Sequence, residues 1–263
     1  MSNHKALNMF GRSGNPSLNA QTFSNSAKDA TFNAYTPTAT MTLEGTVNKT
    51  GILLALVVIS AFYTWSMFFS SGNPAAVMPI AMGGAIVGFI LALVTIFKKQ
   101  WSSITAPLYA IAEGLFLGAI SAIFEAQYPG IVIQAVGLTL GTLASLLLLY
   151  KTGIIKPTEN FRLMVASATM GIGMLYLVSM LMNMFGSGGI GFIHSNGLFG
   201  IGFSLFVVGI AALNLVLDFD FIEQGSEMGA PKYMEWFGAF SLMVTLIWLY
   251  LEMLRLLAKL RSR

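Results

Sequence analysis

The chain has 263 residues, of which 56% are hydrophobic and only 10% are charged, and its mean hydropathy is +0.74. A soluble domain carries roughly 25% charged residues, so this composition excludes a water-covered surface and favours an integral membrane protein. The lack of cysteine excludes disulfides and cysteine metal sites, and a net charge of +3 without a basic patch excludes a nucleic-acid partner.

Residues 1–48 differ in composition from the rest of the chain, because Asn, Ser, Thr and Ala dominate and large aliphatic residues are rare. Such a segment buries too little apolar surface to offset the entropy lost on ordering. We therefore predict a flexible polar N-terminal tail over 1–48 and a single transmembrane domain over 49–263.

Long apolar segments follow the tail, each near the roughly 20 residues that cross a hydrocarbon core. We expect them at 51–70, 76–97, 103–124, 131–150, 163–185, 198–220 and 236–258, separated by breaks rich in Gly, Pro and Ser. The predicted fold class is all-α: a polytopic membrane protein formed by a bundle of about seven transmembrane helices.

Glycines recur four residues apart in three of these segments, at Gly84/Gly88, Gly114/Gly118 and Gly137/Gly141. That spacing places both glycines on one helix face and lets two backbones approach closely. The first interpretation is tight packing between helices, and the second is a narrow path between them.

Lysine and arginine are unevenly distributed among the connections. Ten of the 14 Lys and Arg residues precede the first segment or lie in the connections between segments 2 and 3, 4 and 5, and 6 and 7. The connections between segments 1 and 2, 3 and 4, and 5 and 6 have none. By the positive-inside rule, the N-terminus is predicted to be cytoplasmic. The remaining four are Arg255, Lys259, Arg261 and Arg263, which would lie outside after seven crossings. Either the last segment crosses despite them, or one late segment is re-entrant.

Carboxyl groups at membrane depth are costly and are the first candidates for function. Glu113 lies near the middle of segment 103–124. One interpretation is a ligand for an ion or a proton, and the other is a neutral acid that is hydrogen-bonded to a neighbouring helix. Asp218 and Asp220 end segment 198–220, and two steps along a helix turn through about 200°, so they point to different faces. Large apolar residues surround Asp218, which makes it the stronger candidate.

Glu252 interrupts the last segment, and Arg255 follows three residues later on the same face, which predicts an ion pair within the helix. Thr245 lies on much the same face and nearer the membrane centre. Carboxylate oxygens of Asp218 and Glu113 would suit weak, transient contacts with calcium. No enzyme motif occurs in the chain, so we predict neither catalysis nor a bound cofactor.

The last two segments carry a recognisable pattern, which consists of Val216-Leu-Asp218-Phe-Asp-Phe-Ile222, Phe237-Gly-Ala239 and Ile247-Trp-Leu-Tyr-Leu-Glu-Met-Leu-Arg-Leu-Leu257. Together with the seven-segment layout, this pattern resembles the Bax-inhibitor family, defined by the transmembrane Bax inhibitor motif. The bacterial branch of that family is the most similar, on the evidence of Gly45-Thr-Val-Asn-Lys-Thr-Gly51 and Ala230-Pro-Lys-Tyr-Met-Glu-Trp236.

The resemblance implies a bundle with the last helix central and a passive, pH-responsive calcium leak. In the family, an aspartate of helix six and one of helix seven share a proton and hold the pore closed. The first falls on Asp218, but an alignment without gaps places Thr245 at the second position. Either the pH-sensing pair is lost in this chain, or Glu113 supplies the second carboxyl.

Two functions follow from these observations. The first is a pH-sensitive calcium leak whose pathway includes Asp218, Glu113, Asp220, Glu252 and Thr245. The alternative is a non-conducting regulator that binds other membrane proteins, such as a membrane protease. Both have the lipid bilayer as a partner, and the short loops, the lack of cysteine and the bacterial-looking stretches predict a bacterial inner or plasma membrane.

Overall fold

The computed structural model describes residues 40–186 and 188–262, apart from the side chains of Phe192 and His194. It contains seven helices that are long and apolar enough to cross a membrane. Within the described residues, extended pairing is limited to one isolated bridge between Thr40 and Pro231. The prediction of an all-α polytopic membrane protein is therefore confirmed.

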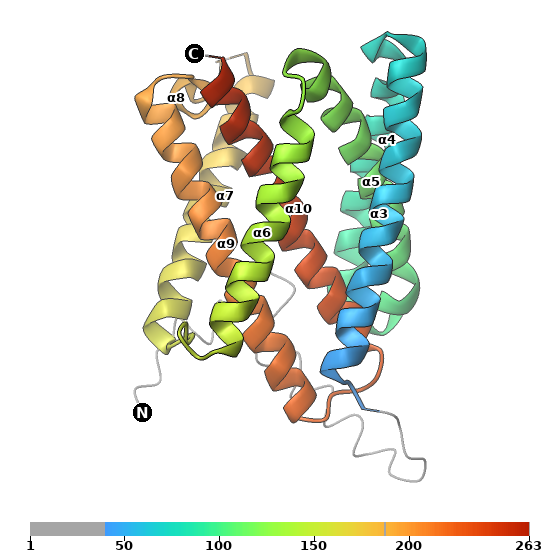
Figure 1. The fold of residues 1–263 in the computed structure, drawn as a ribbon, viewed down its shortest axis with the longest axis vertical. Helices are drawn as coiled ribbons and strands as arrows, with labels where there is room; N and C mark the ends of the chain where they lie inside the picture. The colour runs from blue at the N-terminus through green and yellow to red at the C-terminus, as the bar shows by residue number, and fades with distance from the viewer. Residues whose placement is uncertain (1–39, 187, 263) are drawn as a thin grey trace. The chain divides into compact units, whose positions relative to one another are not determined.

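The long helices, labelled in Figure 1, are α3 (Leu43–Ser71), α4 (Pro74–Phe97), α5 (Ser102–Gln127), α6 (Ile131–Lys151), α7 (Glu159–Met184), α9 (Leu198–Glu227) and α10 (Met234–Arg261). A 3₁₀ turn, η1 (Lys99–Trp101), precedes α5, and a short helix, α8 (Gly191–His194), precedes α9. The sequence did not predict η1 or α8, because both are shorter than the window over which hydropathy identifies a helix.

Helix α3 begins at Leu43, ahead of the predicted start at residue 51. Thr42 caps it by accepting a hydrogen bond from the Gly45 amide at 3.0 Å, which satisfies one of the unpaired donors at a helix start. The hydroxyls of Thr46 and Thr50 then donate to carbonyls one turn earlier, so this polar stretch can be helical. Of the predicted tail, residues 43–48 are thus part of α3, and residues 1–39 lie outside the described residues.

The chain forms two compact units. Of the described residues, unit 1 contains Ile133–Phe221 and 245–262, and unit 2 contains 40–132 and Ile222–Val244. Helices α9 and α10 contribute to both, since the larger part of α9 and the second part of α10 belong to unit 1.

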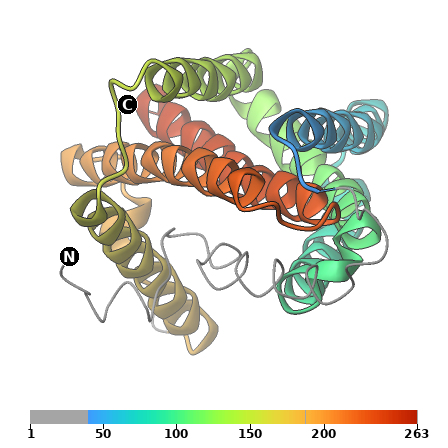
Figure 2. The same ribbon diagram turned by 90° about the horizontal axis from the view of Figure 1, so that it is seen from below.

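In unit 2, α5 packs along α3 and α4, as the two ribbon views show (Figures 1 and 2). Glycines make this packing close: Gly114 and Gly118 of α5 lie against the backbone of α3, and Gly84 and Gly88 of α4 lie against α5. A Cβ at Gly118 would overlap the carbonyl of Ala61. The third predicted pair, 137 and 141, faces open space, so it makes no such contact with the described residues.

In unit 1, helices α7, α9 and α10 contact one another around Ile172, Val207 and Ile210, with Trp248 packed against them. Helix α10 is the most buried of the seven long helices, because 72% of its most apolar window is buried against 17% for α6 and 22% for α7. The last helix is thus an interior helix, as predicted, and the poorly buried apolar helices leave their side chains to lipid.

Candidate functional site

Polar side chains form a column along the contacts between α7, α9 and α10 in unit 1. On α7 and on α10 they recur a heptad apart, which keeps them on one helix face, and α9 supplies the partners of most of them. The members are Arg162, Thr169 and Tyr176 of α7, Ser204, Asn214, Asp218 and Asp220 of α9, and Thr245, Glu252 and Lys259 of α10. The column extends from the first turn of α7 to the last turn of α10.

Asp218 and Thr245 meet in the interior of this column. Asp218 is fully buried, and its Oδ2 accepts a hydrogen bond of 2.5 Å from the hydroxyl of Thr245, which is itself buried. Asp218 and Thr245, the two positions that the resemblance singled out, are therefore in contact. A threonine hydroxyl donates its own proton and does not titrate, whereas a second carboxyl would share one proton with Asp218.

Asn214 lies one helical turn before Asp218 on α9 and contacts α7. Its Nδ2 donates to Thr169 Oγ1 at 2.7 Å and to the carbonyl of Ile210 at 2.9 Å. Its Oδ1 is buried and accepts no hydrogen bond from a described residue. Leaving a buried acceptor unpaired costs about 1–3 kcal/mol, which an additional donor or a cation at that oxygen would offset.

At one end of the column, Asp220 contacts α7. Its Oδ2 lies 2.6 Å from Arg162 Nη2, and both side chains are only 12–13% exposed. Asp218 therefore contacts α10 while Asp220 contacts α7, in agreement with the prediction that they occupy different faces. The Nε of Arg162 is buried and has no hydrogen-bond partner among the described residues.

Toward the other end, Glu252 receives hydrogen bonds from two side chains. Arg255 Nη1 donates to both carboxylate oxygens, at 2.8 and 3.0 Å, so the predicted ion pair within the helix is present. Tyr176 of α7 also donates to Glu252, at 3.0 Å, and its hydroxyl accepts a bond of 2.8 Å from Arg255. Tyr176 was not among the predicted site residues, although its position two heptads after Arg162 places both on one face of α7.

The last turn of α10 contacts the starts of α9 and α6. Lys259 Nζ donates to the carbonyl of Gly200 in the first turn of α9, and Arg261 donates to Gln134 near the start of α6. Because Asp218 also contacts Thr245, the part of α10 from Thr245 to Lys259 runs beside α9. Helix α10 is continuous from Met234 to Arg261 and is long and apolar enough to cross a membrane, and both alternatives for the last segment stay predictions.

Glu113, the other predicted carboxyl, belongs to α5 in unit 2. It is half-buried and packs on a glycine of α4, since a Cβ at Gly88 would lie 2.9 Å from its Oε1. Its role as a second carboxyl for Asp218 stays a prediction. Within the described part of the chain, no three His, Asp or Glu side chains are grouped to hold a metal ion, so weak calcium contacts would depend on mixed oxygen ligands.

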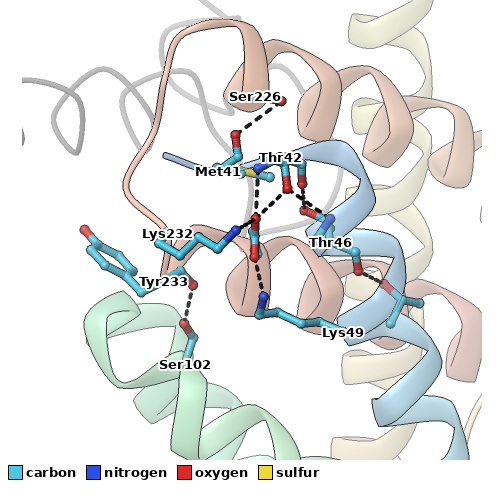
Figure 3. Close-up of polar contacts among 11 residues, drawn as sticks. Met41, Thr42, Thr46, Lys49, Ser102, Ser226, Lys232 and Tyr233 are labelled. Carbon is cyan, nitrogen blue, oxygen red and sulfur yellow. Dashed lines mark hydrogen bonds and ion pairs between the residues drawn. The ribbon is translucent and has the colours of Figure 1, made fainter. Parts of the chain in front are cut away.

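A second polar cluster, in unit 2, was not predicted. Glu235 is fully buried, and its carboxylate accepts bonds from the amide and hydroxyl of Thr42 at 2.9 and 2.8 Å, from Lys232 at 2.7 Å, and from Lys49. Figure 3 shows Lys49 of α3 and Lys232 of the α9–α10 connection directed toward one carboxylate. Backbone bonds reinforce this cluster, because Met41 N donates to the carbonyl of Ala230 at 2.7 Å.

This cluster joins the two stretches, 45–51 and 230–236, from which a bacterial branch was predicted. Lys49 lies in the stretch 45–51, and Lys232 and Glu235 lie in the stretch 230–236. The signal was therefore present in the sequence. Pairing residues so far apart along the chain, however, requires knowledge of the packing.

The fold and the column define the class of this protein: a polytopic α-helical membrane protein that keeps hydrogen-bonded ionisable groups in its interior. The family described as Bax inhibitor 1 like matches residues 15–262. The chain therefore belongs to the Bax inhibitor 1-like family, as its last two segments predicted. Neither the search of curated proteins nor that of solved structures finds a match.

Proposed function

We propose that the protein is a passive cation leak, with calcium as its permeant ion, and that the ion passes Asp218 along the polar column. The observation that carries this proposal is the pair formed by Asp218 and Asn214. It combines a buried carboxylate with a buried amide oxygen that accepts no bond from the described residues, one helical turn away. Carboxylate and amide oxygens are ligands of calcium, and ionisable groups at membrane depth often mark ion pathways.

The described conformation is assigned to the closed state of this leak. Arg162 is paired with Asp220 at one end of the column, and Arg255 with Glu252 toward the other, where Lys259 is also buried. The ammonium of Lys259 opposes the entry of calcium by charge repulsion, and the two arginines occupy carboxylates that a calcium ion would otherwise contact. Opening therefore requires at least one of these contacts to separate.

The pH response is assigned to Asp218, with Glu113 as the alternative second carboxyl. A change in the charge of Asp218 alters its interaction with a cation and so biases an open against a closed packing. Because its partner Thr245 does not titrate, we expect calcium flux to follow a single titration step. Thr245→Asp should introduce a carboxyl pair, whose protons leave in two coupled steps, and flux measured across a range of pH distinguishes the two profiles.

We place this activity in the inner or plasma membrane of a bacterium, with the N-terminus in the cytoplasm. The ten Lys and Arg residues of the N-terminal side and alternate connections support that orientation. The positive residues near the C-terminus are weak evidence against this orientation, because Lys259 is buried and Arg255 is paired with Glu252. The proposal involves no catalysis and no cofactor.

The test is calcium entry into proteoliposomes that contain a trapped indicator, at about pH 6 and about pH 8. We compare the native protein with Asp218→Asn, with Glu113→Gln, and with Glu159→Gln as a control, because Glu159 is an exposed acid of the first turn of α7. Flux should depend on the protein and on pH, change in Asp218→Asn and stay unchanged in the control. A pH dependence that survives Glu113→Gln removes Glu113 from the sensor.

Folded protein that gives no flux above empty liposomes at either pH would refute the leak. That result would favour the alternative of a non-conducting regulator that binds other membrane proteins, such as a membrane protease.

A further inference from the structure

The ammonium group of Lys259 is enclosed at the end of α10. Lys259 is 5% exposed, and its Nζ lies 2.6 Å from the carbonyl oxygen of Ile193, 3.0 Å from that of Gly200 and 2.8 Å from the hydroxyl of Ser204. An ammonium has three protons to donate, so each of them has an acceptor. We refer to these three oxygens, from α8 and the first two turns of α9, as the oxygen cage.

The oxygen cage consists of neutral ligands. No ion pair within the described residues includes Lys259, although burying a lysine without a carboxylate is costly. Converging carbonyl and hydroxyl oxygens replace the hydration shell of a cation, as the carbonyl rings of ion filters do. Calcium–oxygen contacts measure about 2.3–2.6 Å. The distances from Nζ to the three oxygens are 2.6, 2.8 and 3.0 Å, so the cage fits a larger, singly charged cation.

We propose that the oxygen cage is a binding site for an ammonium ion or a potassium-sized monovalent cation, and that the chain's own Lys259 occupies it in this conformation. Lys259 is then a tethered ligand at the end of the polar column. The proposed binding site does not depend on the proposed leak. Its consequence for conduction, that Lys259 blocks this end of the column, rests on the proposed function.

Two variants remove the tethered ligand in different ways. Lys259→Ala removes the side chain beyond Cβ and leaves room for a propylammonium ion, which reproduces the missing atoms. Lys259→Met keeps an apolar stem of nearly the same length, so it leaves room only for ammonium or potassium at the cage. The control is Lys232→Ala, because Lys232 is 49% exposed and binds a carboxylate rather than neutral oxygens.

The measurement is the thermal unfolding temperature of the full chain in detergent, followed by the fluorescence of its four tryptophans. Both Lys259 variants should unfold at a lower temperature than the native protein. Propylammonium should raise the temperature of Lys259→Ala in a saturable way, and ammonium or potassium should raise that of Lys259→Met. Tetramethylammonium at equal ionic strength should do neither, and the control variant should not respond to any of these ions beyond that background.

If neither variant responds to its matching cation beyond the effect of tetramethylammonium, the oxygen cage is not a cation site and the proposal is overturned. Should Lys259→Ala fail to fold, the response of Lys259→Met decides alone. Because unfolding is measured without ion flux, a protein that never conducts can still show this binding, and the two proposals fail separately.

Discussion

Replacing Glu235 by glutamine tests whether the cluster in unit 2 stabilises the fold. The carboxylate is fully buried and accepts four hydrogen bonds, two of them from lysines. Glu235→Gln keeps the shape of the side chain but removes its charge. Its amide would also direct a donor group at an ammonium of Lys49 or Lys232.

The size of the effect follows from the exposure of the two lysines. Lys232 is 49% exposed, so its pair resembles a surface salt bridge worth at most about 1 kcal/mol. Lys49 is only 18% exposed, and breaking a buried pair costs about 3–5 kcal/mol. Since Lys49 retains some water, we expect Glu235→Gln to lower the free energy of unfolding by about 3 kcal/mol, the lower end of that range.

The assay is thermal unfolding in detergent, together with hydrogen exchange of the Met41 amide, which donates to Ala230 next to the cluster. Glu235→Gln should lower the unfolding temperature by about 6–12 °C, at about 2–4 °C per kcal/mol, and speed exchange at Met41. Lys49→Gln should have a larger effect than Lys232→Gln. Exposed Glu227 at the end of α9 provides the control Glu227→Gln. A loss in Glu235→Gln no larger than in this control would refute the reasoning.

Two further predictions concern stability, and thermal unfolding in detergent checks both. Gly118→Ala should cost about 1–3 kcal/mol, because its Cβ would overlap the carbonyl of Ala61, whereas Gly137→Ala faces open space and should be neutral or slightly stabilising. Asp220→Asn should cost about 3–5 kcal/mol, because it leaves the largely buried Arg162 without its paired charge. Equal unfolding temperatures for the two glycine variants, or a native-like temperature for Asp220→Asn, would contradict the packing described here.

Hydropathy predicted the helices well but not which of them is interior. Helices α7 and α10 have the same hydropathy of 1.7 in their most apolar windows, yet 22% of one window and 72% of the other are buried. In a membrane, lipid and protein interior are both apolar, so hydropathy does not separate them. The central place of α10 was expected only from the family resemblance.

The sequence predicted those site residues that stand out locally. Asp218 and Glu252 are charges within apolar runs, and the spacing of Glu252 and Arg255 predicted their ion pair. The pairing of Asp220 with Arg162 and of Glu252 with Tyr176 was not predicted, since a pair across helices depends on packing. The Glu235 cluster was not predicted for a related reason: its acid lies in the first turn of α10, outside the apolar middle of a segment, and most of its partners come from parts of the chain far away in sequence.

Chemical block at the Asp218–Thr245 contact tests the central claim most directly. The chain has no cysteine of its own, so Thr245→Cys provides a single thiol beside Asp218. Calcium entry into proteoliposomes of this variant is measured before and after treatment with a positively charged methanethiosulfonate, and again after reduction. We predict that the reagent labels the thiol and stops calcium entry, and that reduction of the labelled protein restores calcium entry. Calcium entry that continues in fully labelled protein, or a thiol that stays unlabelled while the liposomes conduct, would show that the ion does not pass Asp218.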